Sequence, residues 1–400
     1  MPKKVSKSII HGEATSGFEE VRVEFEKNFI ERGETGAACA IYHKGGKVVD
    51  LWGGYRDAKT QTPWEEDTMV LVFSATKGLA SMAVAVAHSR GLFEYDEKVT
   101  TYWPEFAQQG KENITVRQLL SHQAGLCAID ESLDLRKLAD LDAVSIAISK
   151  QKPHWEPGTK HGYHAASLGL YEGELIRRTD PKHRSLGQFF HDDIATPLNL
   201  EFYIGLPPNI PNERLATVKL FPPPLMLFHP IAMPWRVTLA MLMPWSLTYR
   251  SFMNPNTGDP NARDYYSIEF PSGNGIGDAR SMAHAYSAFS TGGSELGITK
   301  ATLEALTTPA DLPSLGPHDQ VLKFDTRYSL GYSKPYAHSE SGKREKAFGT
   351  DGMGGSYAYA DPDAQVGYAY VTNKHGYYPN DDPRDKSIRD IMYRCIQRLG

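Results

Sequence analysis

Cysteine is scarce in this sequence of 400 residues, and basic residues are not in excess. The three cysteines, Cys39, Cys127 and Cys395, lie far apart and match no metal-ligand spacing. They therefore predict no disulfide framework and indicate a reducing compartment. Acidic residues outnumber basic ones by 48 to 43, which gives a formal net charge of −5. This balance argues against nucleic acid as the main partner.

Long uninterrupted apolar segments are also missing. The first seven residues are basic, but Ile9-Ile10 is too short an apolar core for a signal peptide, so a cytoplasmic location is expected. Residues 221–245 are strongly apolar, yet their prolines and Arg236 argue against a transmembrane helix. Packing in a buried core is the favoured interpretation of that segment. The alternatives are a wall or lid for a hydrophobic acyl group, or a peripheral contact with a membrane or lipid.

The pattern of elements predicts one large α/β domain with two lobes. The hydrophobic content of 40% is enough for a large core. Both ends of the chain carry an amphipathic helix and a hairpin, whereas residues 111–264 contain helical segments, many prolines and no clear hairpin. The helices are expected at 17–31 and 385–399, and the hairpin strands at 37–42, 48–52, 355–360 and 367–372. We therefore expect one α/β lobe from 1–110 plus 265–400, a mainly helical lobe from 111–264, and a ligand pocket between them.

A serine and a lysine stand three residues apart just before an apolar stretch. Ser74 and Lys77 precede a segment of small apolar residues that reads as a buried helix ending near Arg90-Gly91. Residues i and i+3 of a helix share one side, so the hydroxyl and the amine are predicted to be neighbours. Burial disfavours the charged form of a lysine, which makes Lys77 a candidate base for Ser74. A capped helix with a surface lysine is the simpler alternative.

Further segments follow this motif in a recognisable order. They are Leu120-Ser121-His122 with Gly125-Leu126, Pro157-Gly158-Thr159 leading to Gly162-Tyr163-His164, the helix start at Ser272–Asp278, and Phe348–Ser356 before the last hairpin. Together with Ser74-Ala75-Thr76-Lys77, they resemble the serine β-lactamase and penicillin-binding-protein-like family, which includes class C β-lactamases, D-peptidases and family VIII carboxylesterases. The resemblance extends from about Phe18 to the C-terminus, and the Gly162-Tyr163-His164 form is most similar to the carboxylesterases.

The resemblance implies a β-lactamase/transpeptidase-like fold, with an antiparallel sheet flanked by helices from both chain ends, and an acyl-enzyme mechanism. Ser74 is the implied nucleophile and Lys77 its base, with Tyr163 sharing the proton and passing it to the leaving group. A cationic Lys77 is expected to lower the pKa of Tyr163. The implied oxyanion hole consists of the backbone N–H groups of Ser74 and Met353.

Two departures from the family pattern bear on the substrate. Ala165 stands where β-lactamases have an asparagine, and Thr350 followed by Asp351 stands where the family has a lysine or histidine. A substrate carboxylate would lack its positive partner, which favours a neutral ester or an uncharged amide over β-lactams and D-alanyl peptides. Candidate substrate-binding residues are Thr350, Asp351, Gly352 and Asn274.

The sequence thus predicts a serine hydrolase, most simply a carboxylesterase acting on small neutral esters without a metal or organic cofactor. The alternatives are a β-lactamase or D-amino-acid peptidase, and a weakly catalytic or non-catalytic scaffold that keeps the fold. Intact Ser74, Lys77 and Tyr163 argue against the scaffold. The sequence gives no indication of an oligomeric state.

Overall fold

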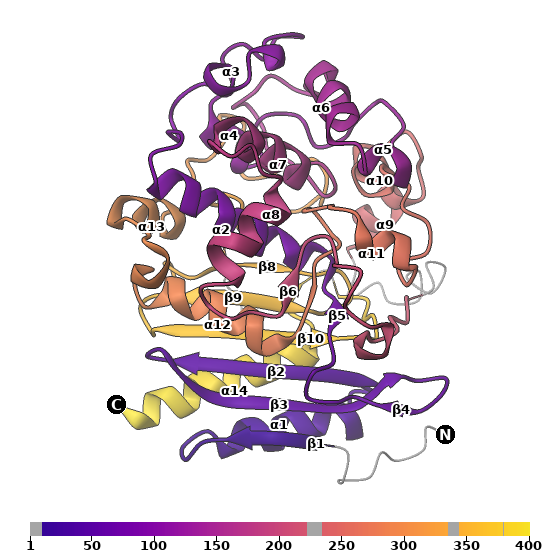
Figure 1. Cartoon of the computed structure of the whole chain (residues 1–400), viewed down its shortest axis with the longest axis vertical. Helices are drawn as coiled ribbons and strands as arrows, with labels where there is room; N and C mark the ends of the chain where they lie inside the picture. Colours follow the sequence, from indigo (N-terminus) through magenta and orange to yellow (C-terminus); the bar gives the residue numbers. More distant parts are fainter. Residues whose placement is uncertain (1–9, 222–233, 335–343, 379) are drawn as a thin grey trace.

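The computed structural model describes residues 10–221, 234–334, 344–378 and 380–400. Its main element is an antiparallel sheet in the order β1-β3-β2-β10-β9-β8, with β4 paired to β3. The strands are β1 (Ile10–Ala14), β2 (Gly36–His43), β3 (Gly46–Asp57), β4 (Thr62–Pro63), β8 (Phe348–Asp351), β9 (Tyr357–Asp361) and β10 (Val366–Thr372). The pairing of β2 with β10 joins the two ends of the chain, as predicted (Figure 1).

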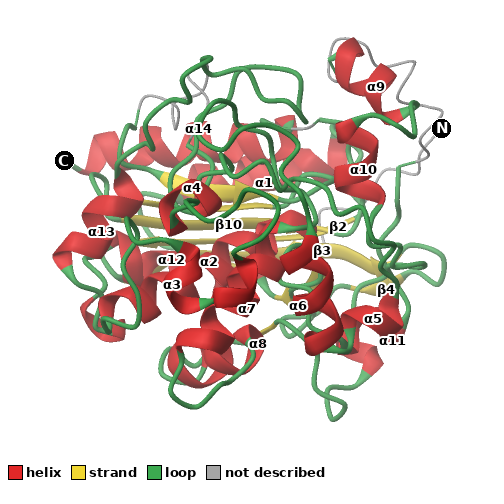
Figure 2. Cartoon of the chain, turned by 90° about the horizontal axis from the view of Figure 1, so that it is seen from above, coloured by secondary structure: helices red, strands yellow, loops and turns green. Residues whose placement is uncertain are grey.

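Helices cover both faces of this sheet. On one face lie α1 (Glu19–Ile30) and α14 (Pro383–Leu399), which pack on each other over aromatic side chains of β9 and β10. The opposite face carries α12 (Ala279–Ser290), which packs on β10, β2 and β9. Figure 2 shows the strands lying between these two helical layers. The predicted terminal helices and both hairpins are confirmed, and Asp278 caps α12 through the Ser281 N–H.

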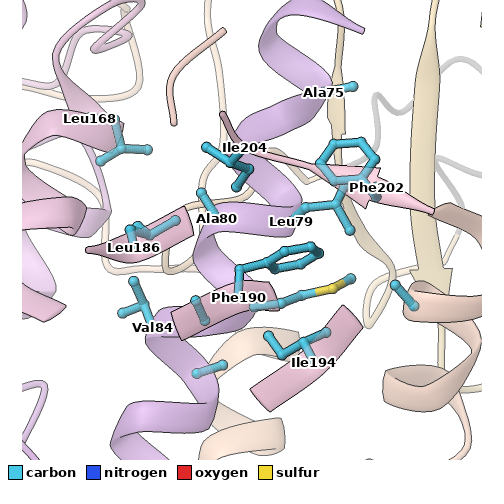
Figure 3. Close-up of a cluster of buried hydrophobic side chains, with 14 of the residues drawn as sticks. Ala75, Leu79, Ala80, Val84, Leu168, Leu186, Phe190, Ile194, Phe202 and Ile204 are labelled. Carbon is cyan, nitrogen blue, oxygen red and sulfur yellow. The ribbon is translucent and has the colours of Figure 1, made fainter. Parts of the chain in front are cut away.

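The central helix of the molecule is α2 (Thr76–Ser89), in which every residue from Thr76 to Ala87 is buried. Small side chains let neighbouring elements approach it closely, and apolar residues from several segments pack around Leu79, Ala80 and Val84 (Figure 3). Its neighbours include α7 (Leu168–Thr179), α8 (Leu186–Phe190) and α13 (Lys300–Thr307). A helix that is apolar all round is a core helix, as the sequence predicts.

The middle of the chain is mainly helical. Its remaining helices are α3 (Val99–Tyr102), α4 (Val116–Leu120), α5 (Leu135–Leu138), α6 (Leu141–Lys150), α9 (Trp235–Met241), α10 (Leu247–Met253) and α11 (Arg263–Ser267). A small second sheet has the order β5-β7-β6 and consists of β5 (Val70–Leu71), β6 (Phe202–Tyr203) and β7 (Ile276–Gly277). The predicted lobe boundaries stay a prediction. No helix in the described ranges has the length and apolar composition that crossing a membrane requires.

A buried arginine ties α14 to the turn between β8 and β9. Arg384 donates to Glu34 at 3.0 Å, to Asp382 at 2.7 Å and to the Gly354 carbonyl at 2.7 Å. Glu34 is itself buried and also accepts from the Tyr370 hydroxyl at 2.6 Å. Removing the guanidinium would leave two carboxylates without their cation inside the protein.

We expect Arg384→Met to lower the free energy of unfolding by about 3–5 kcal/mol, because an uncompensated buried charge is costly. The matched control is Arg394→Met on the same helix, where the side chain is exposed and the change should stay within about 0.5 kcal/mol. Urea unfolding of both variants measures the difference. Equal free energies of unfolding for the two variants would contradict the role of Arg384 as the buried charge partner of Glu34 and Asp382.

Candidate active site

Ser74 lies in a short 3-10 turn, Phe73–Ala75, directly before α2. The sequence places Ser74 on the helix itself, but the α-helix begins only at Thr76. Phe73 has a φ of 48°, a conformation that is unfavourable for a bulky residue. Its ring contacts the ring of His375 edge-on, at a centroid distance of 4.6 Å. This strained residue turns the chain so that half-buried Ser74 reaches the pockets described below.

Lys77 is in contact with Ser74, as predicted. Its Nζ donates to Ser74 Oγ at 3.0 Å and to the Ser272 carbonyl at 2.6 Å. The side chain is only 1% exposed, and this burial lowers the pKa of Lys77 to about 7. A neutral amine keeps N–H groups and gains a lone pair. It can therefore stay bound to the Ser272 carbonyl while it accepts the proton of Ser74.

Tyr163 completes the group from the segment before α7. Its hydroxyl is hydrogen-bonded to Ser74, and Lys77 Nζ lies 5.0 Å from the centre of its ring. The expectation that Lys77 lowers the pKa of Tyr163 is wrong. Burial raises this pKa instead, and Asp351 and Asp319 raise it further. Tyr163 therefore stays protonated near neutral pH and is equipped to donate a proton rather than to take one.

A buried carboxyl group near Lys77 was not predicted. Glu172 lies on α7 with no exposed surface, and Ser81, one helical turn after Lys77, donates to its Oε1 at 2.7 Å. The other oxygen, Oε2, has no hydrogen-bond partner in the described part of the chain. Burial raises the pKa of Glu172 to about 7, and its charge opposes the fall in the pKa of Lys77. No local motif marks Glu172, because only the packing of α7 on α2 brings it to the lysine.

Asp319 is a second residue that the sequence did not reveal. It has no exposed surface and accepts hydrogen bonds from the Tyr163 N–H, at 3.0 and 3.2 Å from its two oxygens. It also accepts from the Tyr328 hydroxyl at 2.7 Å and from the Val321 N–H at 2.8 Å. These bonds fix the backbone of Tyr163. A contact across 156 residues leaves no signal in a single sequence.

The turn from Gly352 to Gly355 carries the second half of the predicted oxyanion hole. A Cβ on Gly352 would lie 2.2 Å from the Val72 carbonyl oxygen, so glycine lets this turn reach the chain beside Ser74. Within the described ranges, the N–H groups of Ser74 and Met353 donate no hydrogen bond. Two unused donors beside the nucleophile are what a developing oxyanion requires. The roles predicted for Ser74 and Met353 remain predictions that this geometry supports.

The predicted substrate-binding residues have different surroundings. Thr350 is buried, and its Oγ1 accepts from the Gly78 N–H and donates to the Ala75 carbonyl, both at 3.2 Å, so it joins β8 to α2. Asn274 has no exposed surface, and its amide binds the Tyr265 and Ile268 carbonyls at 2.8 and 2.7 Å. Asn274 thus braces its own loop, and its position gives no support to a substrate contact. Asp351 and Gly352 line a pocket.

Two pockets meet at Ser74, and Phe252 and Met353 line both of them. The first, called the Tyr163 pocket, is also lined by Tyr163, Val237, Thr238, Met241, Leu322, Phe324, Ser333, Thr350, Asp351, Gly352, Gly354, Gly376, Tyr377 and Tyr378. The second, called the Ala165 pocket, is also lined by Phe73, Ala165, Ala166, Leu220, Met253, Pro255, Asn256, Thr257, Gly258, Pro260, Tyr265, Phe270, Ser272 and Gly273. No lysine, arginine or histidine of the described chain lines either pocket.

The apolar segment 221–245 contributes to the first pocket. Residues 222–233 lie outside the described part. Of the rest, Val237, Thr238 and Met241 on α9 line the Tyr163 pocket, whereas Trp235 and Trp245 are 64% and 76% exposed. A buried core, the favoured interpretation of this segment, is therefore wrong for these two tryptophans. The pocket-wall interpretation fits α9, and a membrane or lipid contact stays a prediction.

In the described ranges, no group of three or more His, Cys, Asp or Glu side chains could hold a metal ion. The groups that meet at Ser74 comprise a serine hydroxyl, an amine with a pKa near neutrality, a protonated phenol and two backbone N–H groups. Such a set can form and hydrolyse an acyl-enzyme.

Known proteins are similar to this chain in both sequence and fold. The family model described as Beta-lactamase matches residues 23–393. The chain is similar to Esterase/beta-lactamase LipL of Mycobacterium tuberculosis (strain ATCC 25618 / H37Rv), with 31% identity over 375 residues, which cover 91% of this chain and 83% of LipL. A crystal structure of a family VIII carboxylesterase aligns with a TM-score of 0.82 and 34% identity, covering 96% of this chain and 99% of that one.

EstA from Arthrobacter nitroguajacolicus Rue61a is similar in structure as well, with a TM-score of 0.82, 28% identity and coverage of 98% and 100% of the two chains. The family match spans Ser74, Lys77, Tyr163 and the Gly352–Gly355 turn, which are the groups that the structure brings together. The resemblance expected from the sequence is confirmed: the chain belongs to the beta-lactamase family and is a serine hydrolase of that family.

Proposed function

We propose that this protein is a carboxylesterase that forms its acyl-enzyme at Ser74. The observation that carries the proposal is the triad of Ser74, buried Lys77 and protonated Tyr163, set beside two pockets whose described lining contains no basic residue. A substrate carboxylate would have no cationic partner there. The esterases among the similar proteins support the same choice.

The proposed reaction has two stages. In the first, neutral Lys77 takes the proton of Ser74 as Oγ bonds to the ester carbonyl carbon, and the Ser74 and Met353 N–H groups stabilise the oxyanion. The bond to the alcohol oxygen then breaks, and Tyr163 gives that oxygen its proton and is reprotonated from Lys77. In the second stage, water attacks the acyl-enzyme with Lys77 again as base, and Ser74 regains its proton.

The proposed partner is a small ester, and the proposed location is the cytoplasm. β-Lactam hydrolysis is the second candidate, because the similar protein LipL is named an esterase/beta-lactamase. Thr350 argues against it, since this residue binds α2 instead of offering a positive charge to a carboxylate. Turnover of nitrocefin, a chromogenic cephalosporin, distinguishes the two candidates.

We expect Ser74→Ala to abolish labelling by a fluorophosphonate probe and to lower the turnover of p-nitrophenyl esters by at least about 1,000-fold, because the nucleophile is gone. The matched control is Ser89→Ala at the far end of α2, which should keep labelling and turnover. Mass spectrometry of the labelled peptide locates the nucleophile. A series of p-nitrophenyl esters with increasing acyl chain length shows which length the site accepts best. Wild-type protein without labelling or turnover would refute the hydrolase proposal and favour the scaffold.

The activity should depend on the protonation of Lys77. Because the neutral amine is the base, kcat/KM should rise as the pH increases through about 7, the pKa of Lys77. Ionised Glu172 favours the protonated amine. Glu172→Gln should therefore lower the pKa of Lys77 and move the acidic limb of the profile to lower pH, by roughly one unit.

The measurement is a pH profile of kcat/KM for a p-nitrophenyl ester from about pH 5 to about pH 9, which covers roughly two pH units on either side of neutrality. The control is Glu174→Gln, two residues further along α7, where the carboxylate pairs with Arg177 and Arg178 and not with the lysine. Its acidic limb should coincide with that of the wild type. An unmoved limb in Glu172→Gln would show that Glu172 has only a structural role.

A further inference from the structure

The two pockets at Ser74 are not equivalent with respect to the reaction. Tyr163 lines one of them but not the other, and Ala165 and Ser272 line only the second. Ser74, Phe252 and Met353 form the boundary that both pockets share. An ester bound with its carbonyl carbon at Ser74 would therefore place its acyl part and its alcohol part in different pockets.

The position of Tyr163 decides which part enters which pocket. The alcohol oxygen leaves as the Ser74 ester forms, and it needs a proton as it departs. Tyr163 is hydrogen-bonded to Ser74 and stays protonated, so it is the group that can supply this proton. The alcohol therefore belongs in the Tyr163 pocket, and the acyl group belongs in the Ala165 pocket, whose described lining carries no charged side chain.

The Tyr163 pocket has the composition of a site for a positively charged group. Five of its lining residues are aromatic, namely Tyr163, Phe252, Phe324, Tyr377 and Tyr378. Aromatic faces attract ammonium groups through the ring quadrupole, and aromatic cages are known to bind quaternary ammonium ligands. Asp351 is the one charged residue in the described lining. Aromatic rings and a single carboxylate, with no lysine or arginine among the described lining residues, are a composition that matches a cation.

The Asp351 carboxyl group is available for such a contact. Asp351 is half-buried, and the described structure gives its side chain a hydrogen bond only with its own backbone. Burial raises its pKa to about 7. Asp385 and Asp381 add to this rise, and Arg389 opposes it. Arg389 is already paired with Asp381 at 2.7 Å and with Asp385 at 2.8 Å. A bound cation would give Asp351 a charge partner of its own.

We propose that the Tyr163 pocket selects esters whose alcohol part carries a positive charge, of the amino-alcohol or quaternary-ammonium class, with Asp351 as the charge partner. The proposal rests on the proposed esterase function and narrows its substrate class. It revises the expectation of a neutral ester on the alcohol side only. The chemistry is unchanged, because the acyl carbon exchanges its bond to the alcohol oxygen for one to Ser74 Oγ, and the alcohol leaves with the proton of Tyr163.

The test compares two esters of nearly the same shape. Acetylcholine carries a trimethylammonium group, and 3,3-dimethylbutyl acetate carries a neutral tert-butyl group in the same place. Acid release is followed in a pH-stat at pH 8, about one unit above the pKa of Asp351. We expect the wild type to show a kcat/KM at least about tenfold higher for acetylcholine. The ratio of the two values cancels any general loss of activity in a variant.

Asp351→Asn should bring that ratio close to one, and Asp351→Glu should retain a preference for acetylcholine because it keeps the charge. The control is Asp363→Asn in the exposed turn after β9, where the carboxylate pairs with Lys346, and its ratio should equal that of the wild type. A wild-type ratio near one, or a ratio that Asp351→Asn leaves unchanged, would overturn the proposal. If neither ester nor any p-nitrophenyl ester is hydrolysed, the esterase function itself fails, and this proposal fails with it.

Discussion

The active site depends on the removal of one amine from water. Lys77 is a useful base for Ser74 only while it is neutral near pH 7, and burial is what lowers its pKa that far. The protein achieves this by placing Lys77 on a helix that the core surrounds on all sides. The Ser272 carbonyl still gives the amine a hydrogen-bond partner at 2.6 Å, so burial does not leave it unsatisfied. In the proposed mechanism, the apolar composition of α2 thus serves catalysis as well as folding.

A buried helix fixes only one part of the site, and the other parts come from distant segments. Each of these segments is held in place by buried hydrogen bonds to another part of the fold. Asp319 holds the backbone of Tyr163, Thr350 joins β8 to the first turn of α2, and Arg384 binds the Gly354 carbonyl in the Gly352–Gly355 turn. Buried polar groups are costly to leave without hydrogen-bond partners, so each contact specifies one arrangement. The geometry at Ser74 therefore depends on buried contacts made by residues other than Ser74, Lys77 and Tyr163.

Sequence reasoning recovered the parts of this site that are local. Ser74 and Lys77 are three residues apart, and alternating and helical apolar patterns identify the hairpins and the terminal helices. Tyr163 and Met353 came from the ordered family segments. Asp319 and Glu172 could not be found in this way, because their roles arise from contacts between α2, α7 and segments far along the chain. The pKa of Tyr163 was mispredicted for the same reason, since its burial is a property of the folded lobe.

In the folded protein, the departures from the family pattern affect the charge of the substrate pocket. Replacing a cation by Thr350 turns this position into a structural link, because a short hydroxyl reaches the Gly78 N–H and the Ala75 carbonyl. The Tyr163 pocket then has no positive side chain in its described lining, and Asp351 is the charge that remains there. The sign of the charge on the alcohol side is therefore opposite to the one that a carboxylate-bearing substrate requires. A pocket with that sign would repel an anion and attract a cation, so the replacement of the family's cation by Thr350 disfavours the carboxylate substrates and favours the proposed cationic ones.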